Sequence, residues 1–396
     1  MNRRHDIDAL RALAFGLVIL YHLAMAYVAG WHWHLKSVHT ADWLQWPMLA
    51  LNLWRMDLVF LISGLAFGFL ARSQRPLSLI RQRSARLLLP LAFGMAVVVP
   101  YQPYAQGVAN GLIAPGFGDF LLRYYSGGPW PRGAFDGWDF GVTWNHLWYL
   151  PYLWFYTVVL ALLQPLAQSR TGQRLRDEAR ALRGWHLLLV PVLPLALYSV
   201  LLWPQFRPTH DLIHDAWLHA VYFTLFVYGW WIGLDAGLWA ELTRLRHRAL
   251  AWALALFGLY AGLRVAAAGA PELRLLARLV ADFYLWAVIV AVLGWAHHRL
   301  NRPWRWLGWA QESVYPWYML HQTVIIAGLV ALAPLQLGPV TEPLALLVLT
   351  VLVCWGLTDG LIRRVGVLRR LFGLTPPARP QCLSPATPAR PGVHTA

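Results

Sequence analysis

Apolar residues along this chain fall into stretches of about twenty, the length at which one α-helix crosses a bilayer core. Short polar connections separate the stretches. This pattern predicts an all-α, polytopic transmembrane bundle with about ten spans. We place the spans near residues 7–29, 48–70, 87–104, 143–165, 186–203, 215–234, 249–268, 276–296, 312–333 and 343–362.

The cations alternate between successive connections. Of the 396 residues only 13% are charged, yet the net charge is +15, and most of the arginines lie in every second connection. Cytoplasmic connections of membrane proteins carry this excess, so both termini are predicted to be cytoplasmic and the number of spans to be even. The arginine-rich segments are residues 3–4, 72–86, 170–183, 244–248, 299–305 and 363–370. Because these cations mark orientation, the positive charge does not indicate a nucleic-acid-binding protein.

Two regions differ from the spans in composition. The long outward connection, residues 105–142, is rich in Gly, Pro and aromatic residues, and we expect it to cover the helices as a partial lid. Residues 375–396 contain six prolines, which prevents a regular helix. The sequence therefore predicts a transmembrane domain over residues 1–374 and a disordered, Pro-rich cytoplasmic tail over 375–396.

The first span carries three ionisable side chains on one helical stripe. Arg11 and His22 are eleven residues apart, which separates them by only about 20° around a helix and by about 16 Å along it. Asp8 lies within about 60° of both. Ionisable groups are costly inside a membrane and usually face a site or a partner. The stripe indicates a polar path through the bundle, although Asp8 and Arg11 could form an interfacial ion pair and His22 could be a packing residue.

These residues resemble the first helix of the acyltransferase 3 family of bacterial membrane proteins. That family has a cation, ten residues and then a histidine in its first helix, as Arg11 and His22 do. Residues 60–64, Phe-Leu-Ile-Ser-Gly, resemble its second-span motif. Residues 83–90, which contain Arg83, Arg86 and Pro90, resemble its Arg-x-x-Arg…Pro segment. Three motifs in the same order make the resemblance specific.

A narrower resemblance is to the osmoregulated periplasmic glucan succinyltransferase branch. It rests on Arg55-Met56, on residues 146–150 (His-Leu-Trp-Tyr-Leu), and on residues 315–324, which contain His321. It covers about residues 5–374. Asp57 departs from this branch, in which a proline is expected. The departure bears on the acceptor more than on the chemistry.

The resemblance implies acyl transfer, with His22 as the catalytic residue and Arg11 as essential. Transfer from a thioester to a hydroxyl needs a base, donors for the oxyanion and a cationic site for phosphates. A histidine suits the base or could itself carry the acyl group. Asp8 could orient a partner. Arg83 and Arg86, at the predicted cytoplasmic mouth of the third span, suit the phosphates of coenzyme A, although they could equally mark orientation.

The remaining candidates are His146, His321 and Arg55. The two histidines could be catalytic or could tie helices together by hydrogen bonds. Arg55, near the middle of the second span, needs a partner elsewhere and is a candidate for binding the acyl donor. We predict no metal site and no permanently bound cofactor. The expected donor substrate is an acyl-coenzyme A, either acetyl or succinyl.

The sequence thus predicts a bacterial inner-membrane acyltransferase that modifies a hydroxyl of an envelope or periplasmic glycan. The alternative is a transporter or flippase in which His22, Asp57, Arg55 and His321 form a substrate or proton path. A membrane glycosyltransferase is less consistent with the sequence, because the first outward loop offers only Asp42 as a carboxylate.

Overall fold

The computed structural model describes residues 4–233 and 235–375; in that part its regular secondary structure is helical, with one isolated bridge between Val28 and Ala41 in place of any strand. The all-α prediction is confirmed for the described residues. The helices are α1 (His5–Met25), α2 (Gln45–Asn52), α3 (Arg55–Ala71), α4 (Pro76–Phe93), α5 (Tyr101–Ala109), α6 (Phe117–Tyr125), α7 (Tyr149–Leu162), α8 (Gln164–Ala167), α9 (Arg170–Ala181), α10 (Trp185–Leu189), α11 (Val192–Leu201), α12 (Ala216–Ile232), α13 (Ala236–Ala266), α14 (Leu273–Leu300), α15 (Leu307–Leu332), α16 (Thr341–Leu357) and α17 (Gly366–Leu371).

Short 3-10 and π segments join or extend these helices. The 3-10 segments are Asp42–Leu44, Trp138–Phe140, Asn145–Trp148 and Ala333–Leu335, and the π segments are Gly94–Val98 and Thr358–Ile362. The segment Asn145–Trp148, labelled η4, carries one of the candidate histidines.

In the described part of the chain, six helical segments are long and apolar enough to cross a membrane, or eight if each of two bent pairs is one span. The bent pairs correspond to the predicted spans 87–104 and 186–203. Helices also occupy the predicted spans 143–165 and 215–234, but α7 and α12 have 14 and 17 residues and are short for a span. The structure therefore supports a multi-pass membrane protein. The number ten and the orientation of the termini stay predictions.

Three local predictions need correction. The second predicted span breaks at residues 53–54, so that Arg55 begins α3 instead of lying inside a continuous helix. Helix α4 begins at Pro76, whose fixed backbone angle suits the first turn, so Arg83 and Arg86 lie inside a helix and not ahead of one. His146 lies in a 3-10 turn before α7, not within the helix. The predicted tail, apart from Thr375, lies outside the described residues.

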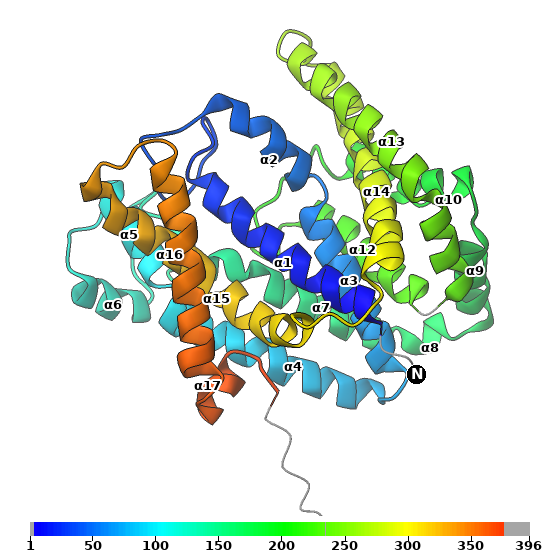
Figure 1. Ribbon diagram of the computed structural model, residues 1–396, viewed down its shortest axis with the longest axis horizontal. Coiled ribbons are helices and arrows are strands. Elements are labelled where there is room, and N and C mark those ends of the chain that lie inside the picture. Colours follow the sequence, from blue (N-terminus) through cyan, green and yellow to red (C-terminus); the bar gives the residue numbers. More distant parts are fainter. Residues whose placement is uncertain (1–3, 234, 376–396) are drawn as a thin grey trace, which may run out of the picture.

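The outward connection, residues 105–142, is a folded segment and not only a lid over the helices. It contains the end of α5 and all of α6, and its aromatic side chains pack into a small core of their own around Phe120, Tyr124 and Trp130. In Figure 1, α5 and α6 lie at the left of the molecule, and α9 and α10 lie at the opposite side.

Helix α1 is central to the bundle and packs against α15, α14 and α3. Figure 1 shows α1 crossing the middle of the molecule, with α15 beside it and the α13–α14 hairpin projecting at the upper right. The residues predicted to matter on α1 are thus placed among other helices.

Two glycines let α3 and α12 approach until their backbones touch. A Cβ atom at Gly64 would lie 1.9 Å from the carbonyl oxygen of Phe226, and one at Gly229 would lie 1.9 Å from that of Leu61. Small residues of this kind are how membrane helices pack closely. The contact positions α3, and with it Arg55 at the start of that helix.

We expect Gly64→Ala to destabilise the protein by about 1–3 kcal/mol, because the added methyl group forces the two helices apart. Thermal unfolding in detergent measures this as a lower Tm. The matched control is Gly262→Ala on α13, where an added Cβ would meet nothing within 4 Å. Equal Tm values for the two variants would show that the close contact contributes nothing.

Candidate active site

Helices α1 and α15 bring two candidate histidines into direct contact. The Nδ1 atom of His22 lies 2.8 Å from the Nε2 atom of His321, although the residues are 299 positions apart. The two rings are nearly parallel, with an interplanar angle of 16°. Because each ring comes from a different packed helix, the pair depends on the tertiary fold and has no local sequence signal.

The partners of His321 fix where the protons of this pair lie. Its Nδ1 atom is 2.8 Å from the carbonyl oxygen of Tyr318 and 3.1 Å from that of Trp317, so Nδ1 carries a hydrogen and donates it. In the neutral ring Nε2 is then an acceptor, and the atom that donates to it is Nδ1 of His22. The Nε2 atom of His22 is left with a free lone pair. A base needs such an atom.

A cavity of about 810 Å³ adjoins this pair. It is lined by side chains of two kinds, polar groups that include His22, His146 and Gln322, and aromatic rings that include Trp144 and Trp148. The side chain of His22 therefore faces a partly polar cavity and not acyl chains. This is the geometry that a histidine base requires, since a substrate hydroxyl must reach Nε2 within hydrogen-bonding distance.

His146 is brought to the same place but has a different environment. Its ring lies edge-on to His321, with ring centroids 5.1 Å apart. Its Nε2 atom donates to the carbonyl oxygen of Met319 at 3.0 Å, and its Nδ1 atom accepts from the amide of Gln102 at 3.2 Å. Both ring nitrogens are thus engaged. His146 is placed to hold the wall of the cavity, and its predicted catalytic role stays a prediction.

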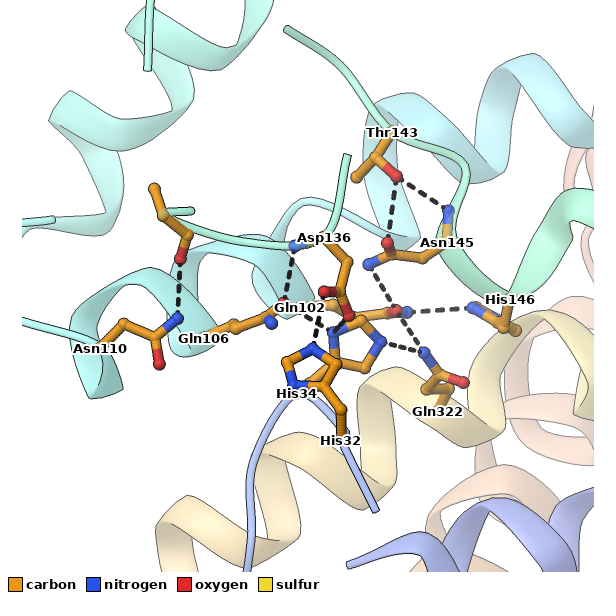
Figure 2. Close-up of polar contacts among 11 residues, drawn as sticks. His32, His34, Gln102, Gln106, Asn110, Asp136, Thr143, Asn145, His146 and Gln322 are labelled. Atoms are coloured by element: carbon orange, nitrogen blue, oxygen red, sulfur yellow. Dashed lines mark hydrogen bonds and ion pairs between the residues drawn. The ribbon is translucent and has the colours of Figure 1, made fainter. Parts of the chain in front are cut away.

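Two buried glutamines extend this wall as a hydrogen-bonded network, which Figure 2 shows. The carbonyl oxygen of Gln102 accepts from Gln322 at 3.0 Å and from Asn145 at 3.1 Å, and its amide also donates to Thr323 at 2.7 Å. Buried polar groups that are fully paired make a wall rigid. Gln102 is not among the residues predicted from the sequence. Its signal was available, because an amide inside a predicted span needs a partner.

The network continues into the outer connections through His34. Gln322 donates to Nε2 of His34 at 2.9 Å, while Nδ1 of His34 donates to Gln106 at 2.7 Å and lies 3.2 Å from Asp136. Burial lowers the pKa of the His34 imidazole below its ordinary value, which keeps the ring neutral, as its accepting Nε2 requires. His32 pairs with Asp136 at 2.9 Å (Figure 2). The segment that includes Asp136 is thereby tied to the loop after α1.

The arginines at the other end of α1 form a separate cationic cluster. Arg11, Arg83 and Arg86 lie within electrostatic reach of one another and of the Tyr315 phenol. The Tyr315 hydroxyl donates to the backbone carbonyl of Arg86 at 3.3 Å. Within the described residues no ion pair neutralises Arg83 or Arg86, and the Nε atom of Arg83 is buried without a partner. Concentrated positive charge of this kind attracts an anionic ligand.

Arg55 lies beside the histidines and not in this cluster. Its guanidinium stacks on the Tyr21 ring at 3.5 Å and is within electrostatic reach of His22 and His321. The side chain is 6% exposed, and its Nε and Nη1 atoms have no hydrogen-bond partner. Arg55 was predicted to bind the donor together with Arg83 and Arg86, but the structure places it apart from those two arginines. It puts an unsatisfied cation close to the candidate base.

Asp8 is remote from the histidines. It lies fourteen residues before His22 on one continuous helix, a separation of about 21 Å. The neighbouring Asp6 forms the ion pairs at this end of α1, with Arg4 at 2.7 Å and with His297 at 2.7 Å. An orienting role for Asp8 could act only near Arg11, and it stays a prediction.

Comparison with known proteins identifies the family. Residues 4–359 match the acyltransferase domain family Acyl_transf_3, a match that covers nearly the whole described chain. The chain belongs to this family. It is therefore an acyltransferase, and the family resemblance seen in the sequence is confirmed, whereas the glucan succinyltransferase branch is not. No curated protein and no solved structure matches this acyltransferase.

Proposed function

We propose that this acyltransferase moves an acetyl or succinyl group from cytoplasmic acyl-coenzyme A to a hydroxyl of an envelope or periplasmic glycan. The observation that carries the proposal is the free Nε2 atom of His22, whose ring is oriented by His321 and borders an 810 Å³ cavity. The bacterial inner membrane is the proposed location. Family membership favours this enzyme over the transporter or flippase.

The geometry supports a direct transfer. The acceptor hydroxyl gives its proton to Nε2 of His22 while its oxygen attacks the thioester carbonyl. The carbon–sulfur bond then breaks, and the coenzyme A thiolate takes the proton back from His22, so that an ester and a free thiol are formed. When His22 is protonated, Nε2 of His321 accepts from its Nδ1–H and stabilises the cation, as the orienting residue of a catalytic triad does.

Two cationic elements suit the donor at different depths. Arg83 and Arg86, with Arg11, provide charge for the phosphates of coenzyme A, about 16 Å along α1 from His22. The pantetheine arm would span that interval between the helices. Arg55, next to the histidine pair, suits stabilisation of the oxyanion that develops on the thioester carbonyl, because a buried cation acts strongly in a low-dielectric site. We therefore propose that Arg55 binds the thioester carbonyl of the donor and not its phosphates.

The experiment uses purified protein in liposomes, with radiolabelled acetyl- or succinyl-coenzyme A added on one side and a glucan acceptor on the other. Label in the glucan supports the proposal. Substrate crossing the liposome with no label in the glucan would support a transporter and overturn it. If label appears in the glucan only when donor and acceptor are on the same side of the membrane, the acyl-transfer reaction is supported but transfer across the membrane is contradicted.

We expect Arg83→Gln to raise the KM for acyl-coenzyme A by about tenfold with little change in kcat, because it removes one charge-assisted contact with phosphate. Initial rates over a range of donor concentrations measure the two constants. The matched control is Arg81→Gln, an exposed arginine two residues earlier on α4. An unchanged donor KM in the Arg83 variant would remove this residue from the donor site.

A further inference from the structure

A second arginine-lined cavity lies away from the acyl-transfer site, where α9 meets α3, α8 and α12. It has a volume of about 270 Å³ and is lined by three arginines and two glutamines, together with the Trp230 ring. The polar lining residues are Arg72, Arg176, Arg180, Gln164 and Gln168. Neither the histidine pair nor the Arg83–Arg86 cluster contributes to it.

The guanidinium groups of this cavity are only partly neutralised. Arg72 and Arg176 are both within electrostatic reach of Arg180. Arg180 lies 3.9 Å from Asp235 and Arg176 lies 3.7 Å from Asp177, both long for ion pairs, and the Nε atom of Arg176 is buried with no hydrogen-bond partner. Arg180 donates to the backbone carbonyl of Trp231 at 2.8 Å, which fixes its position. The cavity therefore carries incompletely neutralised positive charge, which suits an anionic group.

An apolar groove of about 380 Å³ adjoins the cavity and shares Arg180 with it. Most of its lining is aliphatic or aromatic, from Leu175 and Ala179 on α9 to Pro194 and Trp286 on later helices. The groove and the cavity thus meet at Arg180, with a cationic lining on one side and a mainly hydrocarbon lining, which also contains Glu178, on the other.

The sequence of α9 explains why the two ends meet. Arg176 and Arg180 are four residues apart, as are Leu175 and Ala179, so each pair forms a stripe and the stripes are neighbours on the helix surface. Helix α9 also makes an angle of 114° with the helices α10 and α11 that follow it. An amphipathic helix across the direction of a span is typical of one that lies in the membrane interface, where its arginines meet lipid phosphates.

We propose that this site binds one anionic phospholipid, with the phosphate and headgroup in the arginine-lined cavity and an acyl chain in the apolar groove. Charge complementarity favours a lipid of net negative charge over a zwitterionic one. The hydrocarbon groove favours a lipid over a soluble phosphate. The inference is independent of the acyl-transfer proposal, since the two sites share no residue.

Native mass spectrometry of the purified protein with defined lipids tests the inference. We expect one molecule of phosphatidylglycerol to bind, and phosphatidylcholine to bind at least about fivefold more weakly. Arg176→Gln should weaken phosphatidylglycerol binding by about fivefold, and the double variant with Arg72→Gln by roughly 30-fold. The matched control is Arg170→Gln, an exposed residue of the same helix that lines neither the cavity nor the groove, and its affinity should equal that of the native protein.

A second variant tests the hydrocarbon end without removing charge. Ala179→Trp places a large ring in the groove and should weaken phosphatidylglycerol binding by at least about fivefold, while thermal unfolding reports whether the variant folds. Equal binding of phosphatidylcholine and phosphatidylglycerol would overturn the proposal. So would full binding by Ala179→Trp together with displacement of the lipid by inorganic phosphate or coenzyme A, which would make the cavity a site for a soluble anion.

Discussion

Replacement of His22 by alanine is expected to lower acyl transfer to the glycan by roughly 10²–10⁴-fold, the range that a positioned base contributes. The loss should fall on kcat, because the donor phosphates and the cavity wall are held by other residues. Label transfer in proteoliposomes measures it. Insertion and folding are checked by size-exclusion behaviour and by Tm.

The matched control is His186→Ala, an exposed histidine on α10 that lies outside the cavity and the cationic cluster. Its rate should equal that of the native protein. A folded His22→Ala variant with transfer within threefold of native would exclude His22 as the base. Similar losses of rate in His22→Ala and His186→Ala would show that the loss is not specific to the position of His22.

His321 is expected to act through His22, as a positioning residue. His321→Leu removes the acceptor for the Nδ1–H of His22, so the ring can rotate or change tautomer, and kcat should fall by roughly 10²-fold or more. His321→Gln can still accept that hydrogen bond through its side-chain oxygen and should recover much of the rate. The donor KM should not change in either variant.

Comparison of the two His321 variants distinguishes a positioning role from a purely structural role. A purely structural role predicts that rate follows Tm across the two variants. If the glutamine variant is as slow as the leucine variant at equal Tm, the hydrogen bond between the two rings does not orient His22, and another explanation of the pair is needed.

The sequence was informative about features that repeat along one helix. Each predicted apolar stretch contains a helix in the structure, although several bounds differ, and the spacing of Arg11 and His22 put the two on one face of α1. Membership of the acyltransferase family could be predicted from three short motifs. These signals are local, because helix geometry relates positions along one chain segment directly.

Contacts between helices could not be predicted from local signals of this kind. The His22–His321 pair joins residues on α1 and α15, and no periodicity relates them. Likewise His34 lies in a loop, and it enters the site only because the outer connection folds back over the cavity. The break that places Arg55 at the start of α3, the bend at residues 99–100 within one predicted span and the bend at residues 182–184 ahead of another were not predicted either, because a continuous apolar stretch does not mark where its helix breaks.

The proposed acyl transfer requires that the Nε2 atom of His22 carries no proton and faces a polar cavity. Solid-state ¹⁵N NMR of the protein in lipid, with labelled histidine and His22→Gln used to assign the signal, tests it directly. The predicted spectrum shows His22 as a neutral ring protonated at Nδ1, with an unprotonated Nε2 that responds to addition of a glycan acceptor. A ring protonated at Nε2, or one whose nearest contacts are lipid acyl chains, would contradict it.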